Sequence, residues 1–263
     1  MTDNYKNLIL KIEGPFAEVI LNRVDVRNSF NKLLIQEIKQ IFEKLSKDPH
    51  VRAITLRGAG KVFCAGADLE MMKEMVEFSL DQNRTEALEM YDMFDAIFHC
   101  DKPVIAVAHG AAFGGALGLL ACADIVICEE KTQLCFSEVK LGLVPAVISH
   151  FLTKKISLGF LNPLMLTGRI FSANEALQMG LVHYVTETAE IDLQIKNTLE
   201  SFKQVGPEAV GATKKLLQLM TQADDATARQ SSSQVIAERR VSDEGQEGLK
   251  SFLEKRSCAW RIK

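Results

Sequence analysis

Two short segments rich in small residues could place backbone N–H groups against a ligand. Residues 61–69 leave one apolar run through Cys64-Ala65-Gly66-Ala67, and Gly114-Gly115 follow another apolar run and open a helix. Small residues let the backbone approach a ligand closely, and free N–H groups at a helix start can donate to an oxygen that carries negative charge. The two segments therefore predict an anion-stabilising site, although each one alone is also compatible with an ordinary turn.

Two nucleotide-binding signatures are not completed in the sequence. Gly60-Lys61 suggests a P-loop, but Thr55 occupies the position of its first glycine, and Val62 that of the magnesium-binding serine or threonine. No G-x-G-x-x-G pattern follows an apolar run. We therefore expect neither an ATP-binding protein nor a dinucleotide-dependent enzyme.

The composition argues against several other classes. The 31 basic and 34 acidic residues give a net charge of −3, which predicts no general attraction to nucleic acid or to anionic membranes. The six cysteines form no C-x-x-C pair, so we expect no metal, and we expect free thiols in a reducing, cytoplasmic environment. No secretory signal is expected at the start. Pro103 and His109 argue against a membrane span at 104–127.

Seven motifs follow one another along nearly the whole chain: Leu21-Asn22-Arg23 with Arg27-Asn28-Ser29, Phe63-Cys64-Ala65-Gly66-Ala67-Asp68, His109-Gly110-Ala111-Ala112-Phe113-Gly114-Gly115, Ala123-Asp124, Phe136-Ser137-Glu138 with Leu141-Gly142-Leu143-Val144-Pro145, Leu166-Thr167-Gly168, and Phe252-Leu253-Glu254-Lys255-Arg256. In this order they resemble the crotonase (enoyl-CoA hydratase/isomerase) superfamily. The resemblance implies an α/β fold, a crotonase-like spiral of ββα units with a C-terminal helical trimerisation region. It also implies an acyl-CoA substrate, a homotrimer or dimer of trimers, and no separate cofactor, because coenzyme A is part of the substrate.

The resemblance also assigns roles to individual residues. It implies that the N–H groups of Ala67 and Gly115 form an oxyanion hole that stabilises an enolate, so that bulk at Gly115 should obstruct it. Glu138 matches a catalytic acid/base, although it could also be a surface carboxylate near Lys140. The implied contacts with substrate and coenzyme A involve Arg27, Ala65, Asp68, Gly114, Gly118, Phe252 and Lys255, the last two often reaching the nucleotide from a neighbouring subunit.

Gly118 is the main departure from the family pattern. It stands where typical two-glutamate hydratases carry their first catalytic glutamate, so Glu138 is expected to act alone, with extra room at Gly118 for a branched substrate. The run Pro145–Ser149 resembles the bacterial 3-methylglutaconyl-CoA hydratases of leucine degradation, and His150 is a candidate donor to a distal carboxylate. The resemblance therefore implies an enoyl-CoA hydratase or dehydratase that acts on a branched acyl-CoA thioester. A Δ3,Δ2-enoyl-CoA isomerase remains an alternative, as does a non-catalytic protein that binds coenzyme A or RNA.

Apolar periodicity predicts the elements that must position these residues. It predicts strands at 8–12, 16–21, 51–56, 104–108 and 125–128, and helices at 31–45, 84–98, 114–122, 192–203, 207–221, 225–240 and 243–255. Strands that alternate with helices indicate a parallel α/β sheet. We therefore expect a core at residues 1–191 and a C-terminal helical region at 192–263.

Overall fold

The main sheet carries the loops that form the site. The computed structural model describes residues 5–262. Its main sheet has the order β1-β2-β3-β4-β6-β9, and every neighbouring pair is parallel except the β1–β2 hairpin. The strands are β1 (Leu8–Glu13), β2 (Phe16–Leu21), β3 (Ala53–Gly58), β4 (Val104–Ala108), β6 (Ile125–Glu129) and β9 (Tyr184–Thr186). The predicted hairpin and parallel sheet are confirmed.

A second, smaller sheet was not expected from the sequence. It has the order β5-β7-β8, made of β5 (Ala111–Phe113), β7 (Gln133–Cys135) and β8 (Ile170–Ser172). β5 and β7 are parallel, and β7 and β8 are antiparallel. Each strand has only three residues, which is too short for an alternating pattern to stand out from its surroundings.

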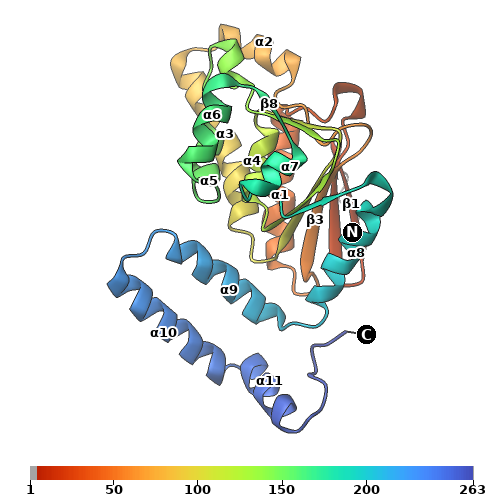
Figure 1. The fold of residues 1–263 in the computed structure, drawn as a ribbon, viewed down its shortest axis with the longest axis vertical. Coiled ribbons are helices and arrows are strands. Elements are labelled where there is room, and N and C mark those ends of the chain that lie inside the picture. Colours follow the sequence, from red (N-terminus) through yellow and green to blue (C-terminus); the bar gives the residue numbers. More distant parts are fainter. Residues whose placement is uncertain (1–4, 263) are drawn as a thin grey trace.

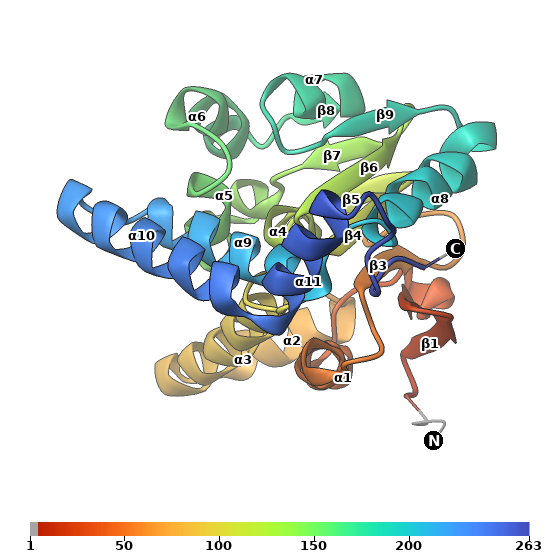
Figure 2. The ribbon, with the colours of Figure 1, turned by 90° about the horizontal axis from the view of Figure 1, so that it is seen from below.

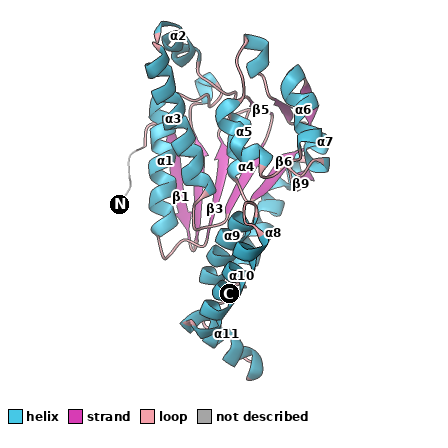
Figure 3. Cartoon of the chain, turned by 90° about the vertical axis from the view of Figure 1, so that its left-hand side faces the viewer, coloured by secondary structure: helices cyan, strands magenta, loops and turns pink. Residues whose placement is uncertain are grey.

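Helices cover both faces of the main sheet (Figures 1 and 3). On one face lie α1 (Lys32–Lys47), α3 (Leu80–Phe98) and α4 (Ala116–Cys122), while α8 (Ile191–Phe202) packs on the other against Ile105, Val107 and Ile127. The remaining core helices are α2 (Leu69–Glu77), α5 (Ala146–Thr153), α6 (Leu158–Thr167) and α7 (Ala173–Gln178). The segment 104–127 is divided among β4, β5, α4 and β6, and no described helix is long and apolar enough to cross a bilayer.

Three helices project from this core as an arm (Figures 1 and 2). These are α9 (Pro207–Met220), α10 (Asp225–Val241) and α11 (Asp243–Leu253), as the sequence predicted. The expected boundary at residue 192 falls within α8, which packs on the sheet, so the projecting part begins after α8. Lys214 anchors α9, because its Nζ lies 2.7 Å from Asp124 Oδ2 and also donates to the Lys102 carbonyl.

Candidate functional site

The two small-residue segments lie side by side. The Phe113 amide donates to the Cys64 carbonyl at 3.1 Å, and an isolated bridge pairs Cys64 with Ala112. Gly66 adopts a φ of +93°, and a Cβ there would lie 2.8 Å from the Phe113 carbonyl oxygen. The contact therefore requires glycine at 66. It brings Ala67 next to the turn that contains Gly114 and Gly115.

The amides of Ala67 and Gly115 are both free. One neighbouring amide on each turn is occupied: Asp68 donates to the Phe30 carbonyl at 2.9 Å, and Gly114 donates to the Cys135 carbonyl at 2.9 Å. Across residues 5–262, neither the Ala67 nor the Gly115 amide donates to a protein acceptor. Since most backbone N–H groups in a folded protein are paired, two free donors on adjacent turns can hold an oxygen that gains negative charge.

Strand register brings Glu138 to the same turn. β5 and β7 end together at the pair Phe113 and Cys135, so the residues that follow each strand continue side by side. Glu138 begins a 3-10 turn, η2 (Glu138–Leu141), and its Oε1 lies 3.4 Å from the position of a Cβ built on Gly114. The carboxylate therefore faces the residue that precedes the free Gly115 amide.

The Glu138 carboxyl is suited to proton transfer. Its Oε2 is buried and has no hydrogen-bond partner within the described part of the chain. Burial raises the pKa of Glu138, while its own backbone N–H acts in the opposite direction. A half-buried carboxyl with a raised pKa can take up and release a proton more easily near neutral pH than an exposed one.

The expected room beside Gly118 is not present. A Cβ at this position would lie 2.5 Å from Ile148 Cγ2 and 2.7 Å from two atoms of the Phe94 ring. Both side chains are buried, so the space of a side chain at 118 is already filled by α3 and α5. The expectation that a branched substrate uses this space is wrong, because packing has closed it.

This packing predicts the behaviour of variants at Gly118. Gly118→Ala should destabilise the protein by about 1–3 kcal/mol, the usual cost of overpacking a core. Gly118→Glu should be worse, since the carboxylate would displace Phe94 or Ile148, and it should not improve activity on straight-chain substrates. Chemical denaturation of the wild type and both variants checks this prediction. Equal stability of Gly118→Ala and the wild type would contradict it.

The end of α4 opposite Gly115 is anchored by a buried cation. Lys155 Nζ donates to the carbonyls of Leu120 at 3.1 Å and Ala123 at 2.7 Å, which are among the last free carbonyls of the helix. Burial lowers the pKa of Lys155 to about 8. A cation at the C-terminal end of a helix is favourable. Lys155 thereby fixes the helix that follows Gly115.

The residues expected to bind coenzyme A fall into two groups. Arg27 is exposed with a φ of +56°, and its carbonyl accepts from the Ala65 amide at 3.0 Å, so these two residues lie together. Asp68 is 5% exposed, its Oδ2 lies 2.7 Å from Arg23 Nη1, and its side chain caps α2 at the Glu70 amide. The Asp68 carboxylate therefore already has partners within the chain. If Asp68 contacts coenzyme A, it would do so through its backbone atoms.

Phe252 and Lys255 lie far from this group in a single chain. They occur at the end of α11, whereas α2 follows Asp68 at the opposite end of the molecule (Figures 1 and 3). Phe252 is 82% exposed. One chain therefore does not assemble all the residues that the sequence suggested for coenzyme A.

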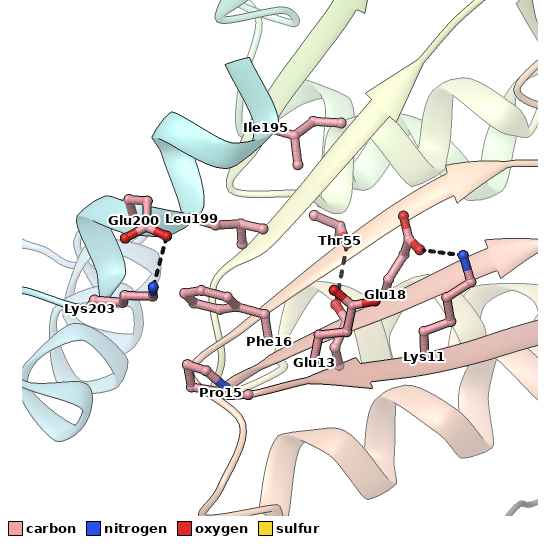
Figure 4. A pocket seen from close by; sticks show the side chains of 12 residues that line it. Lys11, Glu13, Pro15, Phe16, Glu18, Thr55, Ile195, Leu199, Glu200 and Lys203 are labelled. Carbon is pink, nitrogen blue, oxygen red and sulfur yellow. Dashed lines mark hydrogen bonds and ion pairs between the residues drawn. The ribbon is translucent and has the colours of Figure 1, made fainter. Parts of the chain in front are cut away.

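A marked hollow of the chain lies away from Glu138. It has a volume of about 310 Å³ and lies between the β1–β2 turn and α8, with Phe16 and Leu199 among its walls (Figure 4). Two ion pairs lie at its rim, Lys203 with Glu200 at 2.8 Å and Lys11 with Glu18 at 3.3 Å. None of the predicted site residues lines this hollow. Within residues 5–262, no cluster of three or more His, Cys, Asp or Glu could hold a metal.

Three residues from other elements shape the site and were not predicted from the sequence. Phe94 and Ile148 fill the position beside Gly118, and the Phe30 ring lies 3.3 Å from a Cβ built on Gly115. A larger side chain at Gly115 would therefore contact the Phe30 ring first. The expected obstruction of the oxyanion hole would then be an indirect effect of this contact. An apolar residue carries no local signal of which glycine, distant in the sequence, it will contact.

Comparisons with known proteins give consistent results. Residues 11–263 match the family model described as enoyl-CoA hydratase/isomerase. The chain is 31% identical over 252 residues to the short-chain-enoyl-CoA hydratase of Clostridium acetobutylicum, covering 95% of each protein. It is 29% identical to the carnitinyl-CoA dehydratase of Proteus mirabilis, covering 97% of this chain and 98% of that protein. The crystal structure of an enoyl-CoA hydratase from Shewanella pealeana superimposes with a TM-score of 0.93 at 35% identity, covering 97% and 96% of the chains.

Proposed function

Because this chain belongs to the enoyl-CoA hydratase/isomerase family, we propose that it catalyses the reversible hydration of a 2-enoyl-CoA thioester. The motif resemblance and the expected crotonase-like α/β fold are confirmed by the family match and by the similar crystal structure. The observation that carries the proposal is that the half-buried Glu138 carboxyl faces Gly114, next to the free Gly115 amide, while the free Ala67 amide lies on the adjacent turn.

The proposed mechanism uses the chain's own groups. The thioester oxygen would accept from the Ala67 and Gly115 amides, which stabilise the enolate that forms when water adds at Cβ. Glu138 would accept a proton from that water and return one to Cα, because no carboxylate stands at position 118. Preorganised backbone donors and one positioned carboxyl can together supply most of the catalysis that this reaction requires.

A branched, 3-methylglutaconyl-CoA-like substrate is the finer part of the proposal. It now rests on the run Pro145–Ser149, since the space at Gly118 is filled. His150 is a weaker candidate for holding a distal carboxylate than we expected. Its ring lies against Tyr91 with centroids 5.9 Å apart, and burial lowers its pKa, which favours the uncharged form.

The Δ3,Δ2-enoyl-CoA isomerase is retained as a second candidate because Glu138 has no partner carboxylate at 118. Isomerisation moves a single proton and needs no added water. A panel of straight, branched and dicarboxylic 2-enoyl and 3-enoyl thioesters, followed by absorbance and mass, tests both activities. Hydration removes the conjugated absorbance and adds the mass of water, whereas isomerisation of a 3-enoyl thioester creates that absorbance without a change of mass.

We also propose that the chain works as a homotrimer or a dimer of trimers. The described part of α10 buries none of its residues, and Val241, Phe252 and Leu253 at the end of the arm are each at least 78% exposed. Such a concentration of exposed apolar side chains is unfavourable in a monomer. The five buried free cysteines support a reducing, cytoplasmic location.

The assembly proposal predicts the state of the protein in solution. We expect sedimentation at micromolar concentration to show a trimer or a hexamer, because the exposed apolar side chains of the arm are buried when they pack against other subunits. Replacing Phe252 and Leu253 together with serine should weaken the assembly, whereas replacing exposed Val76 of α2 should not. A stable monomer of the wild type would contradict the prediction.

A further inference from the structure

Ser137 carries a hydroxyl group that the fold does not use. It stands at the N-cap of η2, but its side chain accepts no hydrogen bond from the turn. At other N-caps, Ser79, Ser172 and Ser242 each accept a hydrogen bond from a backbone N–H of the helix that follows. Across the described chain, the Ser137 hydroxyl makes no hydrogen bond at all, although the residue is half-buried. Capping therefore does not explain this serine.

The hydroxyl lies at the same place as the catalytic carboxyl. A Cβ built on Gly114 would be 3.4 Å from Ser137 Oγ and 3.4 Å from Glu138 Oε1. The two oxygen atoms therefore border one small space over the Cα of Gly114. Gly114 has a φ of +56°, which turns this face of its backbone toward the two side chains. The free Gly115 amide is the next group along the chain.

When a single carboxyl catalyses hydration, a further group is needed to hold the water. The water must be held while Glu138 takes its proton, and position 118, which is filled by Phe94 and Ile148, cannot contribute a group. A hydroxyl can both donate to and accept from a water molecule. Resting on the hydratase function proposed above, we propose that Ser137 binds the water that adds to Cβ and positions it beside Glu138.

The step balances without an additional reactant. The water oxygen bonds to Cβ, the π electrons of the double bond move toward the thioester oxygen, and one water proton passes to the Glu138 carboxylate. Glu138 then delivers a proton to Cα, and the carbonyl reforms. Ser137 keeps its own proton throughout, so it is a positioning residue for water and not an acid or a base.

Measuring two reactions distinguishes a water-positioning role of Ser137 from a purely structural role. Hydration of a 2-enoyl thioester needs both the water and Glu138. Deuterium uptake from D2O at Cα of the corresponding saturated thioester needs only the oxyanion hole and Glu138. We expect Ser137→Ala to lower the hydration rate by about 10- to 50-fold, the scale of a hydrogen bond to a reacting group, and to leave deuterium uptake close to that of the wild type.

Matched variants complete the test. Ser137→Thr keeps the hydroxyl and should hydrate faster than Ser137→Ala. Ser157→Ala removes another N-cap serine that makes no capping bond and should change neither reaction. The proposal is overturned if Ser137→Ala leaves hydration unchanged, or if it lowers both reactions equally. A wild type that takes up deuterium but hydrates no thioester in the panel would instead contradict the hydratase function.

Discussion

Glu138→Gln is expected to lose at least about a thousandfold in kcat on the best substrate, within the range assigned to positioned acid/base groups. The substitution keeps the size of the side chain but removes the group that exchanges protons. Since the space at Gly118 holds Phe94 and Ile148, no carboxylate can act there in its place. Steady-state assays of hydration and isomerisation, with unfolding curves as a control for folding, measure the effect.

Glu175→Gln serves as a matched control for Glu138→Gln. Glu175 lies in the capping box of α7 and belongs to no part of the site, so its replacement should affect stability more than turnover. Residual activity in Glu138→Gln close to the wild-type value would remove Glu138 from the mechanism. In that case the family membership would remain, but the proton-transfer group would have to be another residue.

The pH dependence of the wild type follows from the same carboxyl. Burial raises the pKa of Glu138 above its ordinary value of 4.5, and the proposed hydration starts with the ionised form. The rate should therefore be full above the raised pKa and fall as the pH drops through it. The acidic limb of kcat/KM should lie above pH 4.5 and should be absent from the residual activity of Glu138→Gln. An acidic limb that both proteins share would assign it to another group.

Gly114→Ala is expected to lower kcat/KM by roughly a hundredfold, the scale of a small misplacement in an active site. The added methyl group would lie 3.4 Å from both Ser137 Oγ and Glu138 Oε1, in the space that the substrate or its water must enter. A positive φ of +56° is also unfavourable for alanine at this position. The effect on activity must therefore be separated from the effect of strain.

Gly14 offers the control for this strain. It has the same φ of +56° in the β1–β2 turn, and a Cβ there would meet nothing within 4 Å. Gly14→Ala and Gly114→Ala should therefore carry similar backbone strain, but only Gly114→Ala should lose activity. Thermal unfolding and kcat/KM of both variants make the comparison. Equal activity in the Gly14→Ala and Gly114→Ala variants would show that neither the substrate nor its water occupies the space beside Gly114.

Most strands of the main sheet could be predicted because their signals are local, whereas the three-residue strand β9 was not predicted. Alternating apolar residues identified the hairpin, and the buried runs at 104–108 and 125–128 identified two central strands. The helix at 84–98 begins four residues earlier, at Leu80, because Ser79 and Gln82 form a capping box that periodicity alone does not reveal. The short strands of the second sheet carry too few residues for such a signal.

The sequence by itself determined the order of motifs, the small-residue turns and the single carboxyl of this site, because residue type and spacing are properties of the chain. Only the tertiary structure decided which atoms share a space. The register of β5 and β7 places Ser137 and Glu138 over Gly114, and the packing of α3 and α5 puts Phe94 and Ile148 where a second glutamate would stand. Such contacts join residues distant in sequence, and they depend on how side-chain volumes fill the core.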